Sequence, residues 1–169
     1  MSVVHIRPER VGEATLISRL IERAFASAMH SDGREQIIVT MLRRADALTI
    51  SLVAEQAGQL LGHIAFSPVA LTDGSLHWYG LAPIAVEPRV QRTGIGSALI
   101  EAGLDELRGL GAAGCVVLGE PDFYRRFGFR QISNLRYPGP PPEYFLALPF
   151  GGSVPDGEVS YHHSFTAVA

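Results

Sequence analysis

The sequence predicts an α+β domain in which helices flank a mixed, largely antiparallel sheet. Three observations indicate this fold class. Two early segments have apolar residues at helical spacing, a series of short apolar strands follows them, and a strand–turn–helix–strand unit lies in the second half. An antiparallel meander followed by one parallel crossover produces a mixed sheet that helices then cover. With 169 residues, we expect a single domain over residues 1–169.

In the first half of the chain, hydrophobic periodicity and turn residues define six elements. Stripes of apolar side chains mark two helices, and alternating or continuous apolar runs mark the strands. Pro8 ends the first strand, and turns at Ala57-Gly58 and Asp73-Gly74 separate the later ones. In chain order we expect a strand at 3–7, helices at 13–25 and 35–44, and strands at 49–54, 60–71 and 78–86.

The second half predicts a crossover helix, a central strand and a closing strand pair. Residues 115–119 are continuously apolar, as in a central strand covered on both faces, and Gly109 and Gly111 end the helix before them. The Pro-Gly-Pro-Pro-Pro run at 138–142 predicts an extended, semi-rigid loop. We expect helices at 95–110 and 121–126, a strand at 115–119, and late strands at 144–148 and 159–166 that pair with each other.

Composition and charge exclude several classes of protein. A net charge of -3 leaves no excess of basic residues to neutralise phosphates, so we expect no nucleic-acid partner. A single cysteine cannot form an internal disulfide, which fits a reducing compartment. No apolar run approaches the roughly 20 residues of a membrane helix, and the N-terminus lacks a secretory signal. We therefore expect a cytoplasmic protein that does not bind membranes.

Some reactive side chains have simpler explanations than chemistry. Cys115 lies on the predicted central strand without an evident base, so we expect it in the core rather than acting as a nucleophile. His63 and His77 lie on predicted strands, where a hydrogen-bonded structural role is common. His162 and His163 are adjacent on a predicted strand, and adjacent strand residues point to opposite faces. They cannot easily share one ion, so we expect no metal site.

The segment 91–96, Gln-Arg-Thr-Gly-Ile-Gly, joins a predicted strand to a predicted helix. Glycines let successive backbone N–H groups converge, and the helix N-terminus adds the positive end of its dipole, so the turn favours a phosphorylated ligand. Two other interpretations stay open. The glycines also suit a tight structural connection. They also suit a dinucleotide fingerprint with Glu120 as the ribose-binding acid, although Leu99 occupies the place of its third glycine.

Several motifs, taken together, indicate one family. They are residues 6–9 before the first helix, 81–86 before the glycine turn, the turn at 91–96, and the Phe-Tyr-Arg-Arg-Phe-Gly-Phe run at 123–129. Their order resembles that of the GNAT N-acetyltransferase superfamily, whose signatures include Q/R-x-x-G-x-G/A in the turn and F-Y-x-x-x-G-F further on. Segments 51–54, 62–68 and 143–145 are similar to a bacterial branch, the YhbS-like proteins. The resemblance covers nearly the whole chain and implies the acyl-CoA N-acyltransferase fold.

The resemblance implies that acetyl-CoA is the cosubstrate and that the glycine turn binds its pyrophosphate. Backbone amides of the turn would hold the phosphates, a side chain of Gln91 or Arg92 would add a contact, and the pantetheine arm would lie beside the end of the preceding strand. A backbone N–H near Ile84 or Ala85 would stabilise the oxyanion. The implied coenzyme-binding residues are Ile84, Ala85, Val86, Gln91, Arg92, Thr93, Gly94, Ile95, Gly96, Ser97 and Tyr124.

The resemblance also implies two catalytic candidates. Tyr124 matches the tyrosine that many family members place beside the coenzyme sulfur, where it would act as the acid for the leaving thiolate. Free tyrosine titrates near ~10 and a thiol near ~8.5, so the transfer would be uphill by only about 2 kcal/mol. Glu120 ends the central strand and is the first candidate for the base, with a water chain as the alternative.

The implied reaction is acyl-CoA-dependent N-acyltransfer, most simply of an acetyl group to a primary amine by direct attack. The acceptor would be a small-molecule amine or an amine of a peptide or protein. Homodimers are common among members of the family, so a homodimer is compatible with the resemblance. A protein of another class, a non-catalytic module that binds or senses acyl-CoA, would keep the same glycine turn without turnover.

Overall fold

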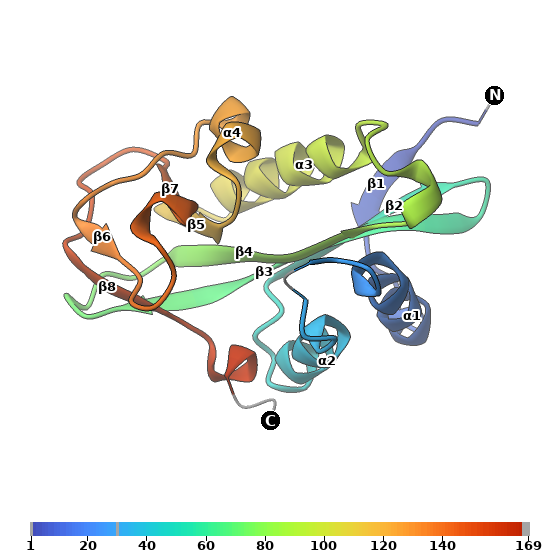
Figure 1. Ribbon diagram of the computed structural model, residues 1–169, viewed down its shortest axis with the longest axis horizontal. Coiled ribbons are helices and arrows are strands. Elements are labelled where there is room, and N and C mark those ends of the chain that lie inside the picture. Colours follow the sequence, from blue (N-terminus) through green and yellow to red (C-terminus); the bar gives the residue numbers. More distant parts are fainter. Residues whose placement is uncertain (1, 30, 167–169) are drawn as a thin grey trace.

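Figure 1 shows the computed structural model, which describes residues 2–29 and 31–166 of the chain. Within these residues, an eight-stranded sheet lies between two layers of helices. The strands are β1 (His5–Pro8), β2 (Ile50–Gln56), β3 (Gln59–Leu71), β4 (Trp78–Val86), β5 (Gly114–Leu118), β6 (Leu135–Arg136), β7 (Phe145–Pro149) and β8 (Gly157–Tyr161). The α-helices are α1 (Ala14–Phe25), α2 (Glu35–Arg44), α3 (Ile95–Gly109) and α4 (Pro121–Tyr124). Short 3₁₀ turns are η1 (Pro88–Val90), η2 (Arg125–Phe127), η3 (Pro142–Tyr144) and η4 (His163–Phe165).

The strand order confirms the predicted mixed, largely antiparallel sheet. In the described part of the chain the main path of the sheet has the order β1-β2-β3-β4-β5-β7, and only β4 and β5 run parallel on that path. The parallel pair is joined through α3, which is the crossover that a parallel connection requires. In the part of the chain that is described, no helix is long and apolar enough to cross a bilayer.

The two late strands differ from the sequence-based expectation, because they do not pair with each other. β7 runs antiparallel to β5, and β8 pairs with β3 and with β6. The physical reason is that β5 is buried and needs a hydrogen-bonding neighbour on the edge that faces away from β4, and β7 supplies it. The predicted second strand also ends early at Tyr161, where the chain turns into η4.

Side chains divide the core into two layers, one on each face of the sheet. α3 and α4 cover one face, and α1 and α2 cover part of the other (Figure 1). The α3-face cluster includes Phe66, Leu81, Leu99, Cys115 and Tyr124. The opposite face carries two clusters, one under α1 and α2 that contains Ile17, Val39, Val53, Ala65 and Ala85, and one near β6 and β8 that contains Val69, Trp78, Val116, Phe145 and Val159.

The parallel strands β4 and β5 separate after a short stretch of pairing. Residues 78–80 pair with 114–116, and no β4–β5 pairing follows within the described chain. Beyond this point β4 contains a bulge, because Phe66 pairs with Leu81 whereas Ile64 pairs with Ile84. Leu81 and Ile84 both pack against the α3-face cluster, although residues three apart on a regular strand face opposite sides. The separation leaves one backbone edge of β4 without a strand partner over its last residues.

Candidate active site

A pocket of about 520 Å³ lies where the end of β4, the start of α3 and the α4–η2 segment meet. Its lining residues are Ile84, Val86, Gln91, Arg92, Gly94, Gly96, Ser97, Phe123 and Arg126. Seven of these nine were predicted as coenzyme-binding residues from the sequence. Phe123 was not, although it lies in the aromatic-basic run that carried the family resemblance. Arg126 was not predicted either, and it lies in the same run.

The glycine turn has the backbone geometry of an anion site. Gly94 is the N-cap of α3 in the left-handed region, at φ +95°, and Arg92 is also left-handed at φ +64°. The first bond into α3 runs from the Ala98 N–H to the Gly94 carbonyl at 3.0 Å. The N–H groups of residues 95–97 therefore belong to the first helical turn, which has no acceptors of its own. A negatively charged ligand at this helix end would satisfy them.

Neighbouring side chains hold the turn in place and contribute charge. The Gln91 side-chain amide donates to the Val86 carbonyl at 3.0 Å, and the Thr93 hydroxyl donates to the Val90 carbonyl at 2.5 Å. Arg126 donates to the Phe123 carbonyl and lies 4.7 Å from the centroid of the Phe123 ring. Among the described residues, neither Arg92 nor Arg126 forms an ion pair. The pocket therefore combines two uncompensated positive charges with a helix N-terminus.

Gly96 shapes the floor of the pocket. A Cβ at this position would lie 3.7 Å from Val86 Cγ2 and 3.9 Å from Ile84 Cδ1, which are ordinary contacts. The protein itself thus leaves room for a side chain here. That room lies between two residues of the pocket lining, so the space fits a ligand that approaches the backbone closely.

The strand beside the pocket presents alternate backbone groups. The Glu87 N–H donates to the Leu61 carbonyl of β3 at 2.8 Å. Because N–H groups alternate along a strand, that of Ala85 also faces β3, whereas those of Ile84 and Val86 face the gap left by β5. The Ala85 side chain is only 2% exposed and packs under α1 and α2. Of these three predicted residues, the structure brings Ile84 and Val86 to the pocket and leaves Ala85 behind it.

Tyr124 lies behind the pocket wall, in the core. Its ring packs edge-on against Phe123 at 5.0 Å and Phe129 at 5.8 Å, and its exposed fraction is 8%. Burial, with a smaller effect of the Cys115 thiol, raises the pKa of Tyr124 to about 12. Its hydroxyl forms no hydrogen bond within the described chain. The side chain is thus a neutral donor without a partner among the described residues.

The other sequence candidates have varied surroundings. Glu120 is exposed after β5, and its carbonyl accepts bonds from the Phe123 and Tyr124 N–H groups, while its carboxylate has no partner among the described residues. Cys115 is fully buried, and burial raises the pKa of its thiol, which fits the expected core role. Thr93 and Ile95 belong to the turn, but their side chains do not line the pocket.

The histidine pair has a different geometry from the prediction. His162 and His163 were expected on opposite faces of a strand, yet their ring centroids are 4.2 Å apart where the chain leaves β8. The cause is η4, whose turn replaces strand alternation. The Nδ1 atom of His162 instead lies 2.9 Å from the Ser164 hydroxyl. The described residues contain no group of three or more His, Cys, Asp or Glu side chains placed to bind a metal ion.

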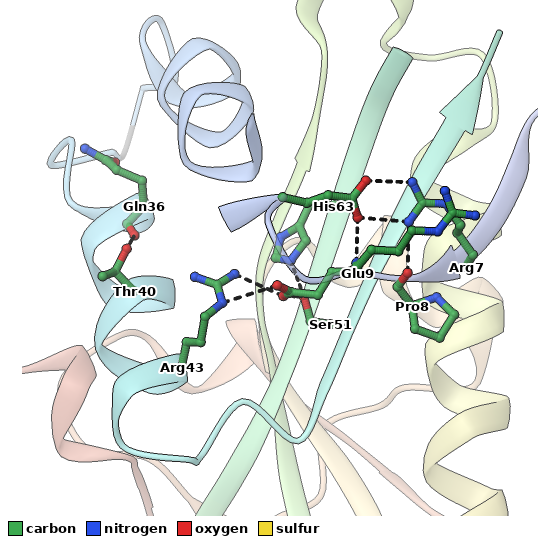
Figure 2. A network of polar contacts seen from close by, with 10 residues as sticks. Arg7, Pro8, Glu9, Gln36, Thr40, Arg43, Ser51 and His63 are labelled. Atoms are coloured by element: carbon green, nitrogen blue, oxygen red, sulfur yellow. Dashed lines mark hydrogen bonds and ion pairs between the residues drawn. The ribbon is translucent and has the colours of Figure 1, made fainter. Parts of the chain in front are cut away.

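A buried polar network on the α1–α2 side surrounds His63. Figure 2 shows Glu9 between Arg43 and Ser51, with His63 beyond Ser51. The Ser51 hydroxyl donates its proton to Glu9, so His63 Nε2, 2.8 Å away, must be the donor to Ser51, and Nδ1 is unprotonated. Desolvation lowers the pKa of His63 to about 4, so the ring is neutral. This network joins four parts of the fold: α2, the segment that follows β1, strand β2 and strand β3. Such a position fits the structural role expected for His63.

A larger pocket, of about 650 Å³, lies between α1 and the β2–β3 hairpin. Its guanidinium groups include Arg7, paired with Glu13 and Glu55, and Arg23, paired with Glu87. Three further arginines line this pocket, but its three glutamates would repel an anionic ligand. The smaller pocket is the better phosphate site, because among the described residues no carboxylate lines it and the start of α3 opens onto it.

Together, the separated parallel strands and the anion-binding helix start define a protein of the acyl-CoA N-acyltransferase class. Comparison with known proteins agrees. Residues 47–131 match the family model described as Acetyltransferase (GNAT) domain. Over 139 residues the chain is 38% identical to the uncharacterized N-acetyltransferase YhbS of Escherichia coli K12, covering 79% of this chain and 80% of YhbS. The chain belongs to the GNAT family.

Solved structures give the same result. A GNAT family acetyltransferase from Brucella melitensis, in complex with acetyl-CoA, is 48% identical with a TM-score of 0.86, covering 96% of this chain and 98% of that one. YhbS from E. coli in complex with CoA is 34% identical with a TM-score of 0.89, covering 100% and 95%. The predicted family and fold are thus confirmed, and the dinucleotide interpretation of the glycine turn is not needed.

Proposed function

We propose that this protein transfers an acetyl group from acetyl-CoA to a primary amine by direct attack of the amine on the thioester. The observation that carries the proposal is the open edge of β4, which leads directly to the anion-binding start of α3. The relatives crystallised with acetyl-CoA and with CoA support the same cosubstrate.

The residues of the pocket suggest how the coenzyme is held. The N–H groups at the start of α3, with Arg92 and Arg126, bind the pyrophosphate, and Gln91 keeps the turn against β4. The N–H groups of Ile84 and Val86 bind the amides of the pantetheine arm. One backbone N–H at the bulge of β4 would then face the thioester oxygen and stabilise the negative charge that develops there.

Tyr124 supports departure of the thiolate as a hydrogen-bond donor. With its pKa at about 12, full transfer of its proton to a thiolate of pKa ~8.5 would be uphill by about 5 kcal/mol. This is more than twice the value expected for an unperturbed tyrosine. Tyr124 therefore stabilises the sulfur by donating a hydrogen bond, and water delivers the proton. Glu120 stays the first candidate base, acting through water because its carboxylate is exposed.

One observation favours the alternative of a non-catalytic acyl-CoA module. Among the described residues, no carboxylate and no histidine lines the pocket at the start of α3. A sensing protein would need the coenzyme site without a base. Turnover distinguishes the two functions.

The first experiment is calorimetric titration with acetyl-CoA, CoA and NAD, followed by a thiol-release assay over a panel of amines. Micromolar binding of both CoA species but not NAD, with release of CoA by at least one amine, is the expected result. Binding without turnover for any amine would favour the sensing module. Failure of both CoA species to bind would overturn the proposed function.

A further inference from the structure

Buried polar atoms without partners remain on the face of the sheet opposite the coenzyme pocket. Among the described residues these atoms are the Ser67 hydroxyl, the Tyr161 hydroxyl and Nδ1 of His63. His63 lies apart, next to Ala85 under α1 and α2. Ser67 is 0% exposed. Native proteins rarely leave buried hydroxyls unpaired, so the two hydroxyls call for a ligand or an ordered water.

Both hydroxyl-bearing residues lie where β4 and β5 begin to separate. Ser67 pairs across the sheet with Gly80, and Gly80 forms the last parallel pair, with Val116 of β5. The Tyr161 ring extends from β8 over Gly80, because a Cβ on Gly80 would lie 2.4 Å from Tyr161 Cε1. Ser67, Gly80 and Tyr161 thus meet at the last parallel pair, where the gap between β4 and β5 begins.

The two sides of the gap carry different groups. Ile84 and Val86, which line the coenzyme pocket, pack against the α3-face cluster together with Tyr124. Trp78 and Val116 belong to the opposite face, on which Tyr161 packs. A thioester that enters from the α3 face leaves only the opposite face for the nucleophile.

We infer that Tyr161 and Ser67 hold the nitrogen of the attacking amine. The inference rests on the proposed function and names the acceptor side of the same reaction. The two N–H groups of a primary amine donate to the two hydroxyl oxygens, and the nitrogen lone pair stays free for the carbonyl carbon. The C–N bond forms, the C–S bond breaks with its electron pair on sulfur, and one N–H proton leaves to water.

The surroundings of Tyr161 keep its hydroxyl in one position. Its ring contacts Tyr137 edge-on at 5.3 Å and Phe165 at 5.2 Å. Gly80 lies within a strand, and its missing side chain makes room for the Tyr161 ring. The Tyr161 ring is therefore held in place before any substrate arrives.

The surroundings of Tyr161 also determine the protonation state in which the amine can bind. Aromatic and apolar side chains pack around Tyr161, namely Tyr137, Phe165 and the cluster near β6 and β8. An ammonium group would lose water without gaining a counter-charge. The site accordingly accepts the amine as its neutral free base.

The test uses a CoA derivative whose sulfur carries a carboxamidomethyl group (S–CH₂–CO–NH₂), so that its two amide N–H groups occupy the place of the two N–H groups of the amine. Calorimetry compares its Kd and that of CoA for the parent, Tyr161→Phe, Ser67→Ala and the control Tyr144→Phe, an exposed tyrosine. The expected result is an unchanged Kd for CoA and about 3- to 10-fold weaker binding of the derivative in the two site variants, as for loss of one neutral hydrogen bond.

A purely structural role of the Tyr161 and Ser67 hydroxyls would give different results in the stability and binding measurements. Removing an unpaired buried hydroxyl does not lower stability, so urea unfolding should show both site variants as stable as the parent. Equal affinity of the derivative for all four proteins, or parallel weakening of CoA and the derivative, would overturn the inference and leave the coenzyme site intact. No binding of CoA to the parent would instead overturn the proposed function, and the inference with it.

Discussion

Tyr124 is a residue whose role depends on its surroundings more than on its type. The ring is held between Phe123 and Phe129, and the hydroxyl has no partner within the described chain. The sequence could place the residue through its motif, but not its pKa, because the shift arises from burial by elements that are distant in sequence. The raised pKa changes the expected role from proton donor to hydrogen-bond donor.

Replacing Tyr124 with phenylalanine should lower kcat and leave coenzyme binding unchanged. A hydrogen bond to a charged group contributes about 1.5–3 kcal/mol, so we expect a loss of about 10- to 100-fold in kcat. Steady-state kinetics and CoA titration measure the two quantities, with Tyr144→Phe as the matched control. Equal kcat in the variant and the parent would remove Tyr124 from the mechanism.

In the parent, the contribution of the Tyr124 hydroxyl to kcat should persist at high pH. Because the pKa of Tyr124 is raised to about 12, its hydroxyl stays protonated through pH 10. We therefore expect that deprotonation of Tyr124 causes no fall in the kcat of the parent below pH 10. Any fall in this range should also be present in Tyr124→Phe. A decline near pH 9 that is present in the parent and absent in the variant would contradict this prediction.

His63 should make the protein less stable in acid. Its folded pKa of about 4 lies below its unfolded value of 6.5, so between these values the unfolded chain binds more protons. The contribution of neutral His63 to the free energy of unfolding is present at pH 7 and is lost as the pH falls. Between pH 7 and pH 5 the free energy of unfolding should fall by about 2 kcal/mol.

Urea unfolding at pH 7 and pH 5 measures this cost. His63→Gln should reduce the difference between the two pH values by about 2 kcal/mol, whereas His5→Gln, at an exposed position, should not. An equal pH dependence in the parent and His63→Gln would show that other groups cause it.

At the scale of elements, the start of α3 should determine coenzyme binding. Gly96→Glu places a carboxylate between Ile84 and Val86 in the pocket, where it repels the pyrophosphate. We expect CoA to bind at least about 100-fold more weakly. Gly94→Glu should also abolish binding, but its left-handed backbone adds strain.

Gly109→Glu is the matched control for Gly96→Glu. It makes the same change at the other end of the same helix, where a Cβ meets no atom within 4 Å. CoA affinity should equal that of the parent. If both variants lose affinity alike, the effect is not local to the pocket.

Local elements were predictable because their signals lie in adjacent residues. The predicted bounds of α2 agree with the structure, and those of α3 differ by one residue at its end. The pairing of β7 and β8 was not predictable, since it depends on which buried edge needs a partner. The acceptor-side hydroxyls were missed for the same reason, although Gly80 inside a strand was a signal of close approach.

At the scale of the whole molecule, ligand binding should be visible as stability. A ligand that binds only the folded state at 100 times its Kd adds about 2.7 kcal/mol. For a chain of this size that corresponds to a rise in Tm of about 5–10 °C. Thermal denaturation with acetyl-CoA, CoA and NAD measures the effect, and an equal shift with NAD would contradict a coenzyme A site.

The separation of β4 from β5 also has a consequence for backbone exchange with solvent. It creates an internal sheet edge, and a ligand that lies along it acts as a missing strand. In the free protein the amide hydrogens of Ile84 and Val86 should exchange with deuterium quickly, while those of Ala85 and Glu87, which face β3, exchange slowly. Saturating coenzyme should slow the first pair and leave the second unchanged, so this alternation along four residues would map the ligand as part of the sheet.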